Sequence, residues 1–232
     1  MAFDLIKYLT DNAITHSISE HGAINIPDDL DLADNKYVTA LPENLTVGGK
    51  LCLSGTHITE LPENLKVGGD IGLYRTKITS LSGGLRVGRD LDLSETQITT
   101  LPRNLVVNGR LNLRGSQVTI LPDGLMVGDW LDLCDTQITI LPNYFTCSSL
   151  YLDPEHFSNV VFRKNCGNNN RTIFAVRANE TFYIAAGYFY GLIEQFEDAV
   201  DRKYSGETAE AYKQAGRDCL DGLKEKLSTK PQ

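Results

Sequence analysis

The chain has 232 residues, of which 41% are hydrophobic, so it is long enough to bury a substantial core. Its formal net charge is -8 and its isoelectric point is near 5.0, which disfavours direct binding to nucleic acid or to an acidic membrane. No apolar run approaches the roughly 20 residues needed to cross a bilayer, and no secretory leader is evident, so we expect a cytoplasmic protein.

Residues 1–40 predict an N-terminal helical cap followed by a partial repeat. Asp4 has the short polar side chain that favours the start of a helix. The apolar face that we expect this region to bury consists of Leu5, Ile6, Leu9, Ile14 and Ile18. Residues 26–32, together with Val38, predict a shortened first coil.

Residues 41–158 contain a repeat. A leucine recurs every 20 residues, at Leu41, Leu61, Leu81, Leu101, Leu121 and Leu141. Proline follows all of them except Leu81, where Ser82 stands instead. The aligned unit is L-P-x-x-L-x-V-G-x-x-L-x-L-x-x-T-x-I-T-x. A period of this length predicts a solenoid in which stacked coils share one continuous core.

Pairs of apolar residues two apart, such as Leu51 and Leu53, predict a short strand in each coil, because alternate side chains share one face. A second column has residues that tolerate a positive φ, and we expect a sharp turn there: Gly48, Gly68, Gly88, Asn108 and Gly128. A third column has short hydroxyl side chains that we expect to form a buried ladder bonded to neighbouring coils: Thr56, Thr76, Thr96, Ser116 and Thr136.

The segment Gly48-Gly49-Lys50-Leu51-Cys52-Leu53-Ser54-Gly55-Thr56-His57-Ile58 resembles the leucine-rich-repeat hallmark L-x-x-L-x-L-x-x-N-x-L, with Gly at the first leucine and Thr at the asparagine. The 20-residue length and Leu-Pro opening are similar to the short repeats of bacterial type III effectors and of phage or prophage proteins. The resemblance implies an α/β solenoid: a leucine-rich-repeat array of short parallel strands.

Residues 159–232 lose the period and predict a small α+β C-terminal cap. Branched and aromatic residues indicate strands at 160–162, 172–176 and 181–185, separated by turns at 167–170 and 178–180. Two helices should follow, the first with Leu192, Ile193, Phe196 and Val200 on one face, with a break at Ser205 and Gly206. The aromatic residues within 182–191 either form the core of this cap or mark a partner site.

In leucine-rich-repeat proteins the outward residues of the strands line a concave face, and partners usually bind there. The resemblance therefore implies a non-enzymatic protein-protein interaction module, with Trp130 as the first choice of anchor. The residues that we expect to bind the partner are Asp70, Tyr74, Asp90, Asp92, Arg110, Asn112, Arg114, Trp130, Asp132 and Tyr151. An inhibitor or effector encoded by a phage or prophage would fit this pattern.

Two other functions remain open. Asp90, Asp92 and Asp132 could imitate nucleic-acid phosphates, bind Ca²⁺ or pair with a basic patch on a target protein. The interleaved Arg110 and Arg114 favour a solvated acidic face over a metal site. An enzymatic or nucleic-acid-directed function could instead lie in residues 159–232.

Catalysis has little support in the sequence. His57 and Cys52 form the one suggestive pair, and no orienting group or phosphate-binding loop accompanies them. Five scattered cysteines, with no Cys-x-x-Cys spacing, indicate neither a disulfide framework nor a zinc site. We expect no enzyme activity, no metal and no cofactor.

Overall fold

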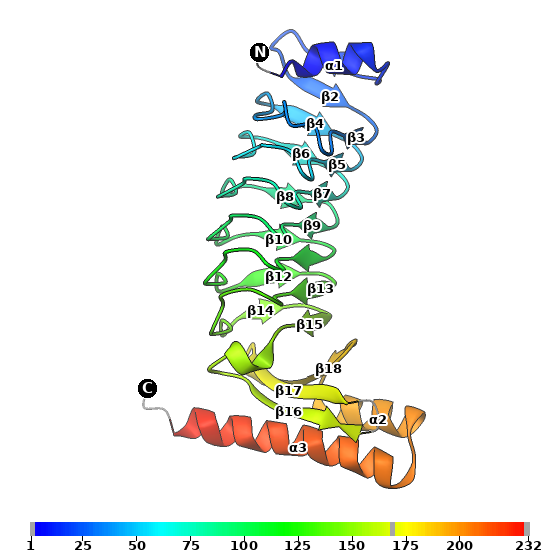
Figure 1. Cartoon of the computed structure of the whole chain (residues 1–232), viewed down its shortest axis with the longest axis vertical. Helices are drawn as coiled ribbons and strands as arrows, with labels where there is room; N and C mark the ends of the chain where they lie inside the picture. The colour runs from blue at the N-terminus through cyan, green and yellow to red at the C-terminus, as the bar shows by residue number, and fades with distance from the viewer. Residues whose placement is uncertain (1–2, 168–169, 230–232) are drawn as a thin grey trace.

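The computed structural model describes residues 3–167 and 170–229. It shows a parallel-strand β-solenoid whose coils stack along the long axis of the molecule (Figure 1). In the described residues the α-helices lie beyond the coils, α1 (Leu5–Asp11) at one end and α2 (Ile193–Lys203) and α3 (Gly206–Ser228) at the other. The helical part of the expected α/β fold is therefore confined to the two ends of the molecule.

Each coil contributes a short strand to each of two sheets. The eight-stranded sheet contains β1 (Ser17–Ile18), β2 (Ile24–Ile26), β4 (Leu45–Val47), β6 (Lys66–Val67), β8 (Arg86–Val87), β10 (Val106–Val107), β12 (Leu125–Val127) and β14 (Phe145–Thr146). The seven-stranded sheet contains β3 (Leu30–Asp31), β5 (Leu51–Cys52), β7 (Ile71–Gly72), β9 (Leu91–Asp92), β11 (Leu111–Asn112), β13 (Trp130–Asp132) and β15 (Ser149–Tyr151). The strands predicted at Leu51 and its equivalents form the seven-stranded sheet, and the eight-stranded sheet was not predicted.

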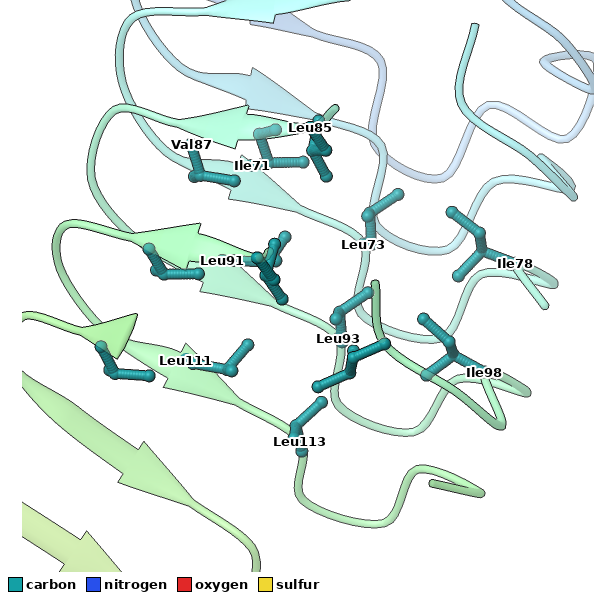
Figure 2. Packing of buried hydrophobic residues seen from close by; sticks show 14 of the residues in the cluster. Ile71, Leu73, Ile78, Leu85, Val87, Leu91, Leu93, Ile98, Leu111 and Leu113 are labelled. Carbon is teal, nitrogen blue, oxygen red and sulfur yellow. The ribbon is translucent and has the colours of Figure 1, made fainter. Parts of the chain in front are cut away.

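The core lies between the two sheets, where the repeated leucine, valine and isoleucine columns meet (Figure 2). Leu91 and Leu93 are 1% and 0% exposed, whereas the intervening Asp92 is only half-buried. The alternation is the one expected of a strand with one buried face. The register expected for the coils is therefore confirmed.

The glycine column has a different role from the expected turn. None of Gly48, Gly68, Gly88, Asn108 and Gly128 has a positive φ. A Cβ at Gly88 would lie 2.0 Å from the carbonyl oxygen of Gly68, so glycine permits close approach of adjacent coils. The positive φ falls instead just before the hydroxyl column, at Gly55, Arg75, Glu95, Gly115 and Asp135.

The hydroxyl column is buried as expected, but its hydrogen bonds stay within each coil. Thr96 Oγ1 donates to the carbonyl oxygen of Leu93 at 2.6 Å, and the other threonines of the column do the same three residues back. The expected bonds to neighbouring coils are therefore wrong, because the turn brings the hydroxyl back to its own strand. Ser116 Oγ is buried without a hydrogen-bond partner in the described residues.

The N-terminal region matches its prediction in part. Asp4 caps α1 by accepting a hydrogen bond from the Lys7 N–H at 3.0 Å, and Leu5 and Leu9 are buried. Ile6 is exposed within α1, on another side of the helix from Leu5 and Leu9. Ile18 is exposed in β1, because the helix ends at Asp11 and the chain continues as a strand. The first coil is lengthened, not shortened, by one residue: β2 and β3 pair with β4 and β5 at a spacing of 21 residues.

The last coil is one residue short, as expected. Leu131 of β13 pairs with Leu150 of β15, a spacing of 19 residues, whereas Met126 pairs with Thr146 at 20. The missing residue therefore lies in the turn around Ser148.

A short 3₁₀ helix, η1 (Pro154–His156), follows the last coil, and the C-terminal segment then forms an antiparallel sheet. The strands of this sheet are β16 (Val161–Cys166), β17 (Arg171–Ala178), β18 (Thr181–Ala186) and β19 (Phe189–Gly191). The three expected strands and two expected helices are found, and β19 is an addition. The middle of the turn expected at 167–170 lies outside the described residues. Leu192 is 38% exposed at the start of α2, not on its buried face.

The sheet is buried on both faces. Phe174 and Val176 belong to the same hydrophobic cluster as the coils, whereas Ile173 and Ala175 pack with Phe196 and the other helical residues. In Figure 1, β17 lies between the last coils and α3. Its near-continuous apolar sequence is explained by this double burial.

Candidate interaction surface

The ten residues expected to bind a partner all lie on the seven-stranded sheet or at the ends of its strands. We call the outward side of this sheet the outer face. The side chains of Asp92, Asn112 and Asp132 each accept a hydrogen bond from the backbone N–H two residues later, at 2.9 to 3.1 Å. These three side chains therefore fix the turn that follows each strand.

Two further aspartates of the outer face join adjacent coils. Asp70 Oδ1 accepts from the Asp90 N–H at 3.2 Å, and Asp90 Oδ1 accepts from the Arg110 N–H at 2.8 Å. Carboxylates that accept backbone N–H groups are held firmly in place. The acidic part of the outer face is therefore already engaged by the protein itself.

The two arginines of the outer face are ion-paired. Arg110 Nε lies 3.2 Å from Asp129, and Arg114 contacts Asp132 at 3.3 Å and Asp135 at 2.8 Å. Partial burial opposes the charge of Arg114, but the combined effect of Asp132, Cys134 and Asp135 is larger, so the pKa of Arg114 is raised above its ordinary value. Charges on this part of the face thus largely balance one another.

An aromatic row crosses from the solenoid to the C-terminal sheet. It consists of Trp130, Tyr151 and Tyr188, whose rings meet edge to face at centroid distances of 6.0 Å and 6.2 Å. The Arg110 guanidinium lies 5.6 Å from the Trp130 ring, so it fixes the first ring in place. Tyr188 is 88% exposed. Large aromatic side chains at such exposure are typical of binding surfaces.

Tyr188 is not among the ten residues expected to bind a partner, although it belongs to the aromatic segment 182–191 that was an alternative partner site. It lies in the two-residue turn between β18 and β19, after Gly187 with φ +63°. Ser149 Oγ donates to its carbonyl oxygen at 3.2 Å and so ties the turn to the last coil. A glycine and one further residue between two apolar runs are typical of a two-residue hairpin turn. This pattern predicts that Tyr188 lies in an exposed turn.

Tyr74 lies apart from the aromatic row. Its ring contacts the guanidinium of its neighbour Arg75 at 4.8 Å. Of the ten expected residues, the structure therefore brings Trp130 and Tyr151 together with Arg110, and it leaves Tyr74 on its own.

A cleft of about 400 Å³ opens beside the aromatic row, where the last coil meets the C-terminal sheet. Tyr151 and Tyr188 line one part of it, and Lys164, Glu155 and Arg171 line another. Lys164 and Glu155 form an ion pair of 2.9 Å. A backbone hydrogen bond, and then the one from Lys164, holds the pKa of Glu155 below its ordinary value.

Cys52 and Cys134 are thiols on the outer face. Burial, followed by the hydrogen bond and charge of Asp132, raises the pKa of Cys134 to about 12. Cys52 contacts Ser54 Oγ at 3.7 Å, and no hydrogen bond between described residues joins it to His57. Within residues 3–167 and 170–229, no three His, Cys, Asp or Glu side chains gather as a metal site would require.

No helix of the described chain has the length and apolar character of a membrane span. Neither a protein-family model nor a curated protein nor a solved structure matches the chain.

Proposed function

We propose that this protein is a non-enzymatic binding module that engages a protein partner through the aromatic row and the adjoining outer face. The aromatic row carries the proposal, because three rings held edge to face form a rigid apolar surface that needs little ordering on binding. Trp and Tyr are enriched among the residues that dominate binding energy.

The state of the charges favours a protein over nucleic acid as the partner. Arg110 and Arg114 are neutralised by aspartates, and the whole chain has a net charge of -8. A mimic of nucleic-acid charge would instead present unpaired carboxylates. The carboxylates of Asp70, Asp90 and Asp132 all accept hydrogen bonds from the backbone.

We also propose that the coils are a short form of the leucine-rich repeat, as the sequence resemblance implies. The burial of both leucines of the Leu-x-Leu pair in each coil supports this assignment. In the same scheme the two ends act as caps, because Leu5 and Leu9 at one end and Phe174 at the other pack against the coils. A cytoplasmic inhibitor or effector of phage or prophage origin is the role that fits this assignment.

The test is capture of a partner from a bacterial lysate, identified by mass spectrometry, with Trp130→Ala and Tyr188→Ala compared with the unchanged protein. Each variant should reduce capture at least tenfold, the effect of losing about 1.4 kcal/mol of binding energy. Tyr37→Ala is the matched control, since Tyr37 is 78% exposed but has no aromatic ring contact among the described residues.

Equal capture by all three variants would exclude the aromatic row as the binding site. Capture of a DNA-handling protein that falls steeply with salt would favour the charge mimic instead. If capture is lost only in variants that change residues 159–232 at positions other than Tyr188, the function lies in that segment.

A further inference from the structure

A second hollow lies on the helix-covered side of the C-terminal sheet, and Arg171 and Tyr188 line both this hollow and the cleft beside the aromatic row. The second hollow has a volume of about 220 Å³ and is enclosed by β18, β19 and the helices α2 and α3. Ala186, Phe189, Phe196 and Val200 give it apolar walls. At about 30 Å³ per water molecule, the space is suited to a ligand of roughly seven or more heavy atoms.

Two charged side chains line this pocket, and both are positive: Arg171 from β17 and Lys203 from the end of α2. Neither has a carboxylate within ion-pair distance among residues 3–167 and 170–229. Arg171 is half-buried, and its guanidinium lies beside the hairpin turn at Gly187. This arrangement is unexpected on a chain with 30 acidic and 22 basic residues.

The acidic residues of α2 do not supply the missing charge. Glu197 pairs with Arg217 at 2.6 Å, and Asp201 pairs with Lys213 at 3.0 Å, both across the interface between the helices. Lys203 is exposed, and its Nζ lies 5.6 Å from the centre of the Tyr204 ring, whereas Arg171 is half-buried. A half-buried cation beside apolar walls is costly in the absence of an anion, and the lower local dielectric strengthens its attraction for one.

We infer that this pocket binds a small monocarboxylate with an apolar body, such as a single-ring aromatic acid or a short aliphatic acid. The carboxylate lies between Arg171 and Lys203, and the apolar body packs against Phe196 and Val200. The same chemistry is offered by a free acid and by the C-terminal carboxylate of a peptide that ends in an apolar residue.

The experiment is calorimetric titration of the full chain with benzoate and with benzamide, which has the same ring but no charge. Benzoate should bind, and benzamide should bind at least tenfold more weakly, because only the acid forms charge-assisted hydrogen bonds. Equal affinities, or no binding of benzoate at millimolar concentration, would overturn the proposal.

Substitutions test the two cations. Arg171→Gln and Lys203→Gln should each weaken benzoate binding about tenfold or more. Arg177→Gln is the matched control, because Arg177 is an exposed, unpaired arginine of the same strand within the described residues. Lys203 ends an exposed helical turn, so its variant should fold even if the Arg171 variant does not. An unchanged affinity in Lys203→Gln would contradict the proposed site.

Two further titrations separate the source of the ligand and the two proposals. In the first, a short peptide ending in phenylalanine is compared with the same peptide carrying a C-terminal amide. Binding of the acid form alone assigns the pocket to the C-termini of peptides as well as to free acids. Equal binding of both forms contradicts recognition of a carboxylate. Trp130→Ala should leave benzoate binding unchanged, since Trp130 does not line this pocket. Tyr188→Ala does not separate the two proposals, because Tyr188 lines this pocket and also belongs to the aromatic row. Trp130→Ala and Lys203→Gln do separate them, since each of these residues belongs to one site only.

Discussion

The solenoid and the C-terminal segment are both rich in β-structure, but they use it differently. Strands of the coils are two or three residues long and parallel, with one buried side and one outward side. Strands β16 to β18 are six to eight residues long and antiparallel, and the sheet is covered by the coils on one face and by helices on the other. The coils thus leave outward positions free for recognition, whereas β17 has almost none to offer.

Sharing one sheet between two hydrophobic clusters should couple the two regions. A side chain such as Phe174 packs with the coils while its neighbour Ile173 packs with the helices, so neither region can lose its order without exposing part of the other. The largest predicted effect tests this coupling.

Leu93→Ala should lower the free energy of unfolding by about 2–5 kcal/mol, because Leu93 is fully buried in the middle of the stack. Urea unfolding would be followed by the fluorescence of Trp130, the single tryptophan, and by the circular dichroism of α2 and α3. Both signals should shift together. If the helices keep their stability while the Trp130 signal shifts, the regions are independent units. Leu192→Ala, at an exposed position, is the control.

The hydroxyl column allows a comparison within the solenoid itself. Thr96→Val should cost about 1–3 kcal/mol, because it removes the hydrogen bond to the Leu93 carbonyl oxygen in a dry interior. Ser116→Ala should be nearly neutral, since the Ser116 hydroxyl is buried without a described hydrogen-bond partner. Thermal unfolding of both variants decides the matter. Similar losses would show that the hydroxyl bond contributes little.

Asn179 joins the two regions and should give the smallest of the three effects. It has φ +50°, and its side chain donates to the Phe145 carbonyl oxygen at 2.8 Å. Asn179→Ala should cost about 1–2 kcal/mol through the lost bond and the backbone strain, and Asn179→Gly should cost less because glycine adopts this φ freely. Equal stability of both variants and the unchanged protein in urea would show that this junction is not coupled.

Much of the solenoid could be predicted from the sequence, because a strict period repeats the same physical environment coil after coil. The buried faces of Leu91 and Leu93, the buried threonines and the one-residue shortening of the last coil all follow from column positions. The second sheet was not predicted, although Leu45 and Val47 alternate as Leu51 and Leu53 do.

Features that depend on neighbours in space were harder to predict. Composition shows that a glycine column exists, but only the stacked coils show that Gly88 faces a carbonyl oxygen instead of taking a positive φ. The residues of the candidate site differ in the same way. Trp130 and Tyr151 could be placed on the outer face from the period, whereas Tyr188 lies outside the repeat and joins them only through the fold.

The turn around Ser148 absorbs the whole one-residue deletion of the last coil. Strand β15 keeps the register of the coils, because Leu150 pairs with Leu131 and Tyr151 pairs with Asp132. Tyr151 therefore lies in the outward column although it follows Asp132 by 19 residues. One glycine added to this turn would restore the full period and leave the phenol outside, since strand pairing, and not the length of the connection, decides which side chains reach the surface.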